Sequence, residues 1–250
     1  MELEERLYAA ASRMAEGLRL ERICLGLGYT AVAVSDGGLG VANTWMDASG
    51  SCRLVDPDTE LEDCPPSELL EGIRSDEPLM RSLALALINA INSHNAMEMP
   101  RDEGNTLLFS RLGLGAGSKV CMVGYIPPLV TRLHQAGAEV EVLDQGKGVG
   151  DRNRFQEKLA SWADRALISA TSLLNRSLED LLACAGDQVQ SALLGPSTPL
   201  IPQAFSHLPV QLLCGMVPLE QEALFRSIRQ GKGTPAIKRN ARKVAVEPTS

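Results

Sequence analysis

The stretch RALISATSLLNRSLEDLLACAG, residues 165–186, is closely followed by SALLGPSTPLIP, residues 191–202, and the two share one plan. In each, a short apolar run, Ala166–Ile168 or Ala192–Leu194, leads into a turn with small hydroxyl-bearing residues. Continuous apolar runs are typical of buried parallel strands, and small hydroxyl residues after them are typical of helix N-caps. Both segments therefore predict a strand, a polar turn and a helix, and they favour an α/β fold.

The segments on either side continue this alternation of strand and helix. KVCMV, residues 119–123, predicts a first buried strand, and the alternating AEVEVLD, residues 138–144, predicts the next one. Residues 155–163 predict a helix, VQLLCG from Val210 predicts the last strand, and residues 218–230 predict the last helix. Regular alternation with short connections favours a parallel sheet with right-handed crossovers.

The N-terminal part has a different pattern. Residues 1–20 have apolar residues at helical spacing, which predicts an amphipathic helix. Residues 22–35 predict two strands separated at Gly26 and Gly28, and a third strand follows the glycine turn at Gly37. We therefore expect an antiparallel meander beside the first helix.

A helix enclosed by protein is predicted for residues 79–94, because apolar residues cover nearly every face of it. Asn89 lies in its middle, and a buried amide needs partners, so Asn89 is either satisfied by the fold or faces a ligand. Residues 98–117 are loop-like and glycine-rich and mark a boundary. The predicted organisation is a small α+β domain at 1–100, a parallel-sheet α/β domain at 101–235 and a basic, flexible tail at 236–250.

Composition limits the classes of function. The net charge of −7 over 250 residues argues against nucleic-acid binding, and the 4% aromatic content argues against a platform for stacking bases. No apolar run approaches the ~20 residues that cross a bilayer, and the acidic start is unlike a signal peptide. We expect a cytoplasmic protein without a membrane partner, and apolar helices in an acidic chain are compatible with a homo-oligomer.

Metal-binding motifs are missing from the sequence. The six cysteines form no CxxC pair, so we expect buried thiols rather than disulfides. His94, His134 and His207 are isolated in sequence, and each is expected to be a surface or packed residue, since metal sites generally show recognisable clusters. Cysteine thiolates that converge in space remain an alternative.

Candidate site residues follow three of the predicted strands. In an open α/β sheet such turns meet at the carboxyl edge, where they can hold a polar or anionic ligand, although each is equally explained as a cap or tight turn. The turn residues are Gly124 and Tyr125 after the first strand, Thr171, Ser172 and Asn175 after the third, and Gly195, Ser197 and Thr198 after the fourth.

Asp144 is a further candidate, at the end of a predicted strand. It lies about twenty residues after Gly124, a spacing that echoes the ribose-binding acid of dinucleotide folds. The G-x-G-x-x-G fingerprint is missing, so the sequence gives little support for NAD.

Five segments taken together resemble a known family. They are GLGYTAVAVSDGGLGVANT, LALINAIN, KVCMVGYIPPLV, LISATSLLNRSLEDLL and ALLGPSTPLIPQAF, in this order. They are similar to the family of uncharacterised prokaryotic proteins known as putative heavy-metal chelation proteins. The resemblance implies an enolase N-terminal-like domain followed by a Rossmann-like domain, with a site in the cleft between them. It also implies that a metal ion or metal chelate is the cofactor to look for, and the matching positions are Tyr29, Thr30, Asn89, Asn175 and the GPST turn.

Three functional hypotheses remain open. In the first, the protein binds a small molecule or metal complex, with hydrogen bonds donated by Thr171, Ser172, Asn175, Ser197 and Thr198, and with Asp144 accepting one. In the second, it is an enzyme acting on a heterocyclic, nucleotide-like or pterin-like substrate, with Asp144 or Tyr125 as acid or base. In the third, the polar turns are only caps of a scaffold.

Overall fold

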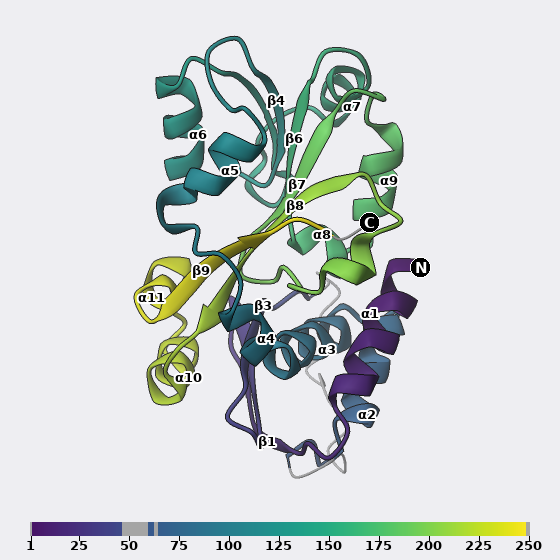
Figure 1. Cartoon of the computed structure of the whole chain (residues 1–250), viewed down its shortest axis with the longest axis vertical. Coiled ribbons are helices and arrows are strands. Elements are labelled where there is room, and N and C mark those ends of the chain that lie inside the picture. The colour runs from purple at the N-terminus through teal and green to yellow at the C-terminus, as the bar shows by residue number, and fades with distance from the viewer. Residues whose placement is uncertain (1, 47–59, 63–64, 249–250) are drawn as a thin grey trace.

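The computed structural model describes residues 2–46, 60–62 and 65–248, and these residues form two β-sheets with helices packed around them (Figure 1). The N-terminal sheet has three antiparallel strands in the order β1-β2-β3. The second sheet has six strands in the order β5-β4-β6-β7-β8-β9, and all its pairs are parallel except β8 with β9. The predicted mixed α/β fold class is confirmed.

The N-terminal sheet is the predicted meander, and it comprises β1 (Leu20–Leu25), β2 (Tyr29–Val34) and β3 (Leu39–Asn43). Every residue of β2 is buried, because helices cover both faces of the sheet. Helix α3 (Pro78–Ile91) lies on one face so closely that a Cβ at Gly40 of β3 would come within 2.0 Å of the carbonyl oxygen of Ala86.

The prediction of an enclosed helix at α3 is confirmed, since eleven of its fourteen residues are buried. One of them is Arg81, whose guanidinium donates hydrogen bonds to the carbonyl oxygens of Ser75 and Leu174, both at 2.6 Å. A buried charge needs such partners, and here one comes before the helix in the sequence and the other comes after it. Arg81 therefore fastens α3 to the segment that precedes α9.

The six-stranded sheet has a separate apolar core on each face. Val120 and Met122 of β4 pack with α5 and α6, whereas Cys121 between them packs with α7, as the period of two in a strand requires. Figure 1 shows α5 and α6 on one side of the sheet and α7 and α9 on the other. The strands are β4 (Lys119–Val123), β5 (Glu139–Leu143), β6 (Arg165–Ser169), β7 (Gln190–Leu194), β8 (Val210–Pro218) and β9 (Ala241–Val246).

The helices have the following bounds. The α-helices other than α3 are α1 (Glu2–Met14), α2 (Pro66–Leu70), α4 (Ser93–Met97), α5 (Thr106–Arg111), α6 (Pro127–Gln135), α7 (Arg152–Ser161), α8 (Thr171–Leu174), α9 (Leu178–Cys184), α10 (Gln221–Arg229) and α11 (Thr234–Lys238). Short 3₁₀ segments are η1 (Glu71–Arg74), η2 (Glu103–Asn105), η3 (Gln145–Lys147) and η4 (Pro202–Phe205).

The C-terminal segment corrects one prediction. Residues 236–250 were expected to be a flexible tail, with the strand at Val210 as the last one, but β9 pairs antiparallel with β8. Val244 and Ala245 are buried, and basic residues stand beside them in the strand, as is common in edge strands. This strand was not predicted because its apolar part is only a few residues long and basic residues surround it.

Two other segments differ from expectation. Residues 98–117 were predicted as a loop, but they contain α5, whose Leu108 and the following Leu112 cover the sheet. The second polar turn was expected to open a helix, whereas β7 is followed by an irregular segment and the short η4. Prolines at positions 196, 199 and 202 explain this, because proline lacks the N–H that a helix interior needs.

The N-terminal and C-terminal parts of the chain are joined by apolar contacts. One core contains residues of α1 and α3 together with residues of α7, β6 and β8. A second joins β2 and β3 to Phe225 and Ile228 of α10 and to Ile237 of α11, so the end of the chain covers the outer face of the first sheet. Among the described residues, no helix combines the length and the apolar character that spanning a membrane requires.

Candidate functional site

A cavity of ≈ 850 Å³ lies at the carboxyl ends of the parallel strands. Turns after β4, β5, β6 and β7 form one side of it, together with residues of β8, β9 and α11. The other side is formed by Tyr29 and Asn43, which are paired neighbours at the end of the antiparallel sheet, and by Trp45. The cavity is therefore built by both sheets.

The structure brings seven of the twelve predicted site residues onto the cavity wall. These are Tyr29, Gly124, Tyr125, Asp144, Thr171, Asn175 and Gly195. Five do not line it, namely Thr30, Asn89, Ser172, Ser197 and Thr198. Ligand binding by the seven stays a prediction, and so does that by Ser172, whereas the contacts of the other four point to a structural role.

The hydroxyl groups of the GPST turn are used within the protein. Ser197 Oγ donates to Asn43 Oδ1 at 2.9 Å and accepts from Asn43 N at 2.8 Å, and Thr198 Oγ1 donates to the carbonyl oxygen of Cys214 at 3.0 Å. Both hydroxyls were expected to donate to a ligand, but each has one proton to donate and that proton is used within the protein. These bonds hold the turn against β3 and β8.

Of the other three residues outside the wall, Thr30 and Ser172 are buried and Asn89 is partly buried. Asn89 donates to the carbonyl oxygens of Val41 at 2.9 Å and Pro196 at 3.5 Å, so of its two predicted roles the contacts match the structural one. Thr30 Oγ1 lies 2.9 Å from Thr44 Oγ1 in a hydrogen bond. Ser172 Oγ is buried without a hydrogen-bond partner among the described residues.

Asp144 holds the turn after β4 in place. Its Oδ2 accepts from the backbone N–H of Tyr125 at 2.8 Å, and its Oδ1 accepts from the N–H of Lys147 at 3.1 Å. Burial acts to raise the pKa of this carboxyl, but the hydrogen bonds from Tyr125 and Lys147 and the Lys147 charge together lower it. Lys147 Nζ in turn donates to the Tyr125 carbonyl at 2.8 Å, so the two turns are tied together.

The turn itself lacks the features of a dinucleotide site. Gly124 has φ +89°, and a Cβ there would lie 2.9 Å from Ser169 Cβ, so glycine allows β4 and β6 to end side by side. Helix α6 then begins with Pro127 and Pro128, which carry no backbone N–H. A helix start without these donors cannot hold a diphosphate in the usual way.

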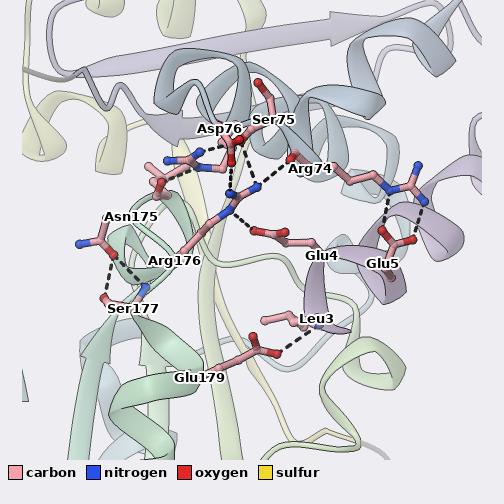
Figure 2. A network of polar contacts seen from close by, with 12 residues as sticks. Leu3, Glu4, Glu5, Arg74, Ser75, Asp76, Asn175, Arg176, Ser177 and Glu179 are labelled. Carbon is pink, nitrogen blue, oxygen red and sulfur yellow. Dashed lines mark hydrogen bonds and ion pairs between the residues drawn. The ribbon is translucent and has the colours of Figure 1, made fainter. Parts of the chain in front are cut away.

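Asn175 is presented by a loop that is fastened to the N-terminal part of the chain (Figure 2). The next residue, Arg176, has φ +56°, and its guanidinium pairs with Glu4 at 2.8 Å and with Asp76 at 2.5 Å. It also donates to the carbonyl oxygens of residues 74 and 75. Asn175 Oδ1 accepts from the N–H and Oγ of Ser177, which leaves the NH₂ group of Asn175 for other partners.

Cationic side chains lie at two places on the cavity wall. Lys147 and Arg152 follow the edge strand β5, whereas Lys238 and Lys243 belong to α11 and to the opposite edge strand β9. Lys243 Nζ donates to Asn105 Oδ1, and its pKa is lowered, first by burial and second by the charge of Lys238. The sequence analysis missed both C-terminal lysines because their positive charge was assigned to a solvated tail.

Two uncharged wall residues were also missed. Asn43 and Trp45 belong to the segment in which the third strand was predicted, but nothing in their spacing distinguishes them from other residues at a strand end. Their position at the rim depends on how the two sheets meet. The one sequence feature that could have indicated them is their place near the end of a strand, where polar residues tend to be exposed.

The described residues contain no group of three or more His, Cys, Asp or Glu side chains that could hold a metal ion. Cys24, Cys121 and Cys214 are buried free thiols as expected, but Cys184 is exposed. It lies at the exposed end of α9, where the apolar pattern of the helix does not continue. Cys52 and Cys64 lie outside the described residues.

Two family models match the chain. The model for residues 107–247 is described as "Putative heavy-metal chelation", and a second model with the same description matches residues 8–92. No curated protein matches the chain.

Two crystal structures share the fold. The first, a protein of unknown function from Pyrococcus horikoshii, is 24% identical, and the alignment covers 99% of this chain and 100% of that one with a TM-score of 0.80. The second, also of unknown function and from Desulfitobacterium hafniense, is 19% identical, and 97% of this chain and 98% of that one are covered with a TM-score of 0.76.

Proposed function

The chain belongs to the family described as putative heavy-metal chelation, and on this premise we propose that it binds an anionic small molecule, either an organic ligand or a metal chelate, in the cavity described above. The site is formed by turns of the six-stranded sheet and by the end of the antiparallel sheet. Open α/β sheets commonly bind ligands at the carboxyl ends of their strands.

The charge of the cavity carries this proposal. The chain as a whole has a net charge of −7, yet four lysine or arginine residues line the cavity against two aspartates, Asp144 and Asp180. A concave site whose charge opposes that of the rest of the protein attracts and concentrates ligands of the other sign. Tyr29, Trp45 and apolar strand ends provide the remaining surface for an organic body.

A chelated metal suits the wall better than a bare ion. Soft heavy metals prefer thiolate ligands, and Cys214 is the cysteine on the wall among the described residues. Burial and the nearby Asp102 charge raise the pKa of Cys214 to about 12, so its thiol stays protonated near neutral pH. Amide, hydroxyl and cationic groups can instead recognise the carboxylates that surround a chelated metal.

Catalysis by Asp144, the enzyme alternative, has less support. A general acid near neutral pH needs a raised pKa, whereas hydrogen bonds lower the pKa of this carboxyl. Its two oxygens are also engaged by the N–H groups of Tyr125 and Lys147.

A thermal-shift screen tests the proposal with nickel–EDTA, iron–citrate, free citrate, nucleotides and the free metal ions as probes. We expect at least one anionic chelate or organic anion to raise the melting temperature, and we expect the double variant Thr171→Val, Asn175→Leu to lose this response. Lys119→Gln is the matched control, because Lys119 lies on β4 at the other end of the same sheet.

Equal stabilisation of the wild type and the double variant would place binding elsewhere. A response to free metal ions alone would also contradict the proposal.

A further inference from the structure

The cationic residues of the cavity belong to the two opposite edges of the six-stranded sheet. At one edge, Lys147 lies in the connection from β5 to α7 and Arg152 is the first residue of α7, and Lys238 and Lys243 lie on α11 and β9 at the other. Five strand spacings of about 4.8 Å separate the edge strands, or roughly 24 Å between their axes. The two pairs of cations therefore stand at opposite ends of one cavity.

The two ends are built alike. At each, one cation is held by the protein: Lys147 lies 3.3 Å from Asp144 Oδ2, and Lys243 donates to Asn105. The side chain of the second cation of each pair, Arg152 or Lys238, makes no hydrogen bond or ion pair to any residue within 2–46, 60–62 and 65–248. Each end thus has one fixed cation and one that is available to a ligand.

The wall between these ends is mainly apolar. Val123, Leu194 and Met216 come from the strands, while Tyr29 of the other sheet and Trp45, which follows β3, also line the cavity. Tyr29 is fixed by a hydrogen bond of 2.6 Å between its hydroxyl and Thr234 Oγ1. Such a surface fits the hydrocarbon or aromatic body of a ligand and repels charge from the middle.

We propose that the ligand is an elongated dianion, with a carboxylate or phosphate group at each end and an apolar body between them. This inference rests on the proposed function, and it adds the arrangement of charge that the ligand must have. Arg152 and Lys147 bind one acidic group, and Lys238 and Lys243 bind the other. A compact anion with a single charged group can engage only one pair at a time.

The probes for the test are alkane-α,ω-bisphosphonates with 4 to 12 carbons and alkyl monophosphonates of the same lengths. We expect calorimetry to show an affinity maximum at one intermediate length, where the bisphosphonate binds at least tenfold more tightly than its monophosphonate. Arg152→Gln and Lys238→Gln should each remove most of this advantage, and the double variant should bind both probes equally. Because neither side chain has a partner among the described residues, these variants should fold normally. Lys119→Gln, which removes one positive charge away from the cavity wall, serves as the control.

Three results would overturn the inference. One is a monophosphonate that binds as tightly as the bisphosphonate of its length, and another is a loss of affinity in only one of the two single variants. No binding by a bisphosphonate of any length would also overturn it. Stabilisation by a metal chelate that is lost in the Thr171→Val, Asn175→Leu variant would then leave the proposed function standing by itself.

Discussion

The Arg176 guanidinium pairs with the Glu4 carboxylate at 2.8 Å, and this contact joins the first helix of the chain to the loop between α8 and α9. The same loop carries Asn175 and Ser177, which line the cavity. Figure 2 shows the side chains of Asn175 and Arg176 pointing in different directions from this loop, so an ion pair outside the wall positions a residue of the wall. The wall depends on the N-terminal helix as well as on the sheet.

Arg176→Met is expected to lower the free energy of unfolding by about 2 kcal/mol, because it leaves the largely buried Glu4 without its partner. The part of the network at Asp76 is exposed and should contribute little. Urea denaturation measures the change. Arg13→Met, an exposed arginine on the same first helix, is the control, and equal effects of the two substitutions would contradict this role of the network.

Asp144→Asn should destabilise the protein by about 2 kcal/mol at pH 7, since hydrogen bonds to a charged acceptor are replaced by weaker ones. The folded-state pKa of Asp144 lies below its ordinary value of 3.8, so its stabilising effect is fully present above that value. The effect is lost as the pH falls through the lowered pKa. The stability difference between the wild type and the variant should therefore shrink in acid, and urea midpoints from pH 7 to pH 3 would measure this; a constant difference contradicts it.

Gly124→Ala should cost roughly 2 kcal/mol or more, because it combines an unfavourable positive φ with a close contact to Ser169. Gly148→Ala is the matched control. Gly148 also has positive φ, at +63°, but a Cβ there meets no atom within 4 Å. Comparing the thermal unfolding of the two variants separates the effect of the contact with Ser169 from the effect of the positive φ. An equal loss of stability in both would show that the contact with Ser169 does not contribute.

Because the pKa of Lys243 is lowered, we expect the stability of the protein to rise in mildly alkaline solution. Its pKa in the folded state is below the ordinary 10.5, chiefly because it is buried, so the unfolded chain binds more protons between the two values. Stability therefore increases with pH across this window. Lys243→Met should remove the increase, and Lys238→Gln should reduce it by taking away a repelling charge. Urea midpoints between pH 8 and pH 10.5 give the slope; an unchanged slope in Lys243→Met would refute the assignment.

Much of the fold could be predicted from local patterns. The apolar run at Ala166–Ile168 and the strand that ends at Asp144 follow from periodicity, and the helix at Pro78 follows from the lack of a polar face. Residues 241–246 could not be assigned in the same way, since a short edge strand with Arg242 and Lys243 has the composition of a solvated tail. Its pairing with β8 is a long-range contact that local composition does not encode.

The candidate site was predictable only in outline. Topology gathers the turns after parallel strands at one edge, so Thr171 and Asn175 reach the cavity together with Gly195. The direction of each hydroxyl is decided by its nearest partner, and for Ser197 that partner is Asn43, which is 154 positions away in the chain. Such partners can be identified only once the arrangement of the two sheets is known. The same holds for the position of the lysines of α11 and β9 on the cavity wall.

The packing of α10 and α11 on the meander has a consequence for synthesis on the ribosome. Phe225, Ile228 and Ile237 cover strands that are translated about two hundred residues earlier. During translation the outer face of the first sheet stays exposed to solvent. It can be buried only after α10 and α11 have left the exit tunnel. The first sheet therefore depends on residues that are made late in translation, so a nascent chain stalled before residue 221 should expose the meander to chaperones and proteases.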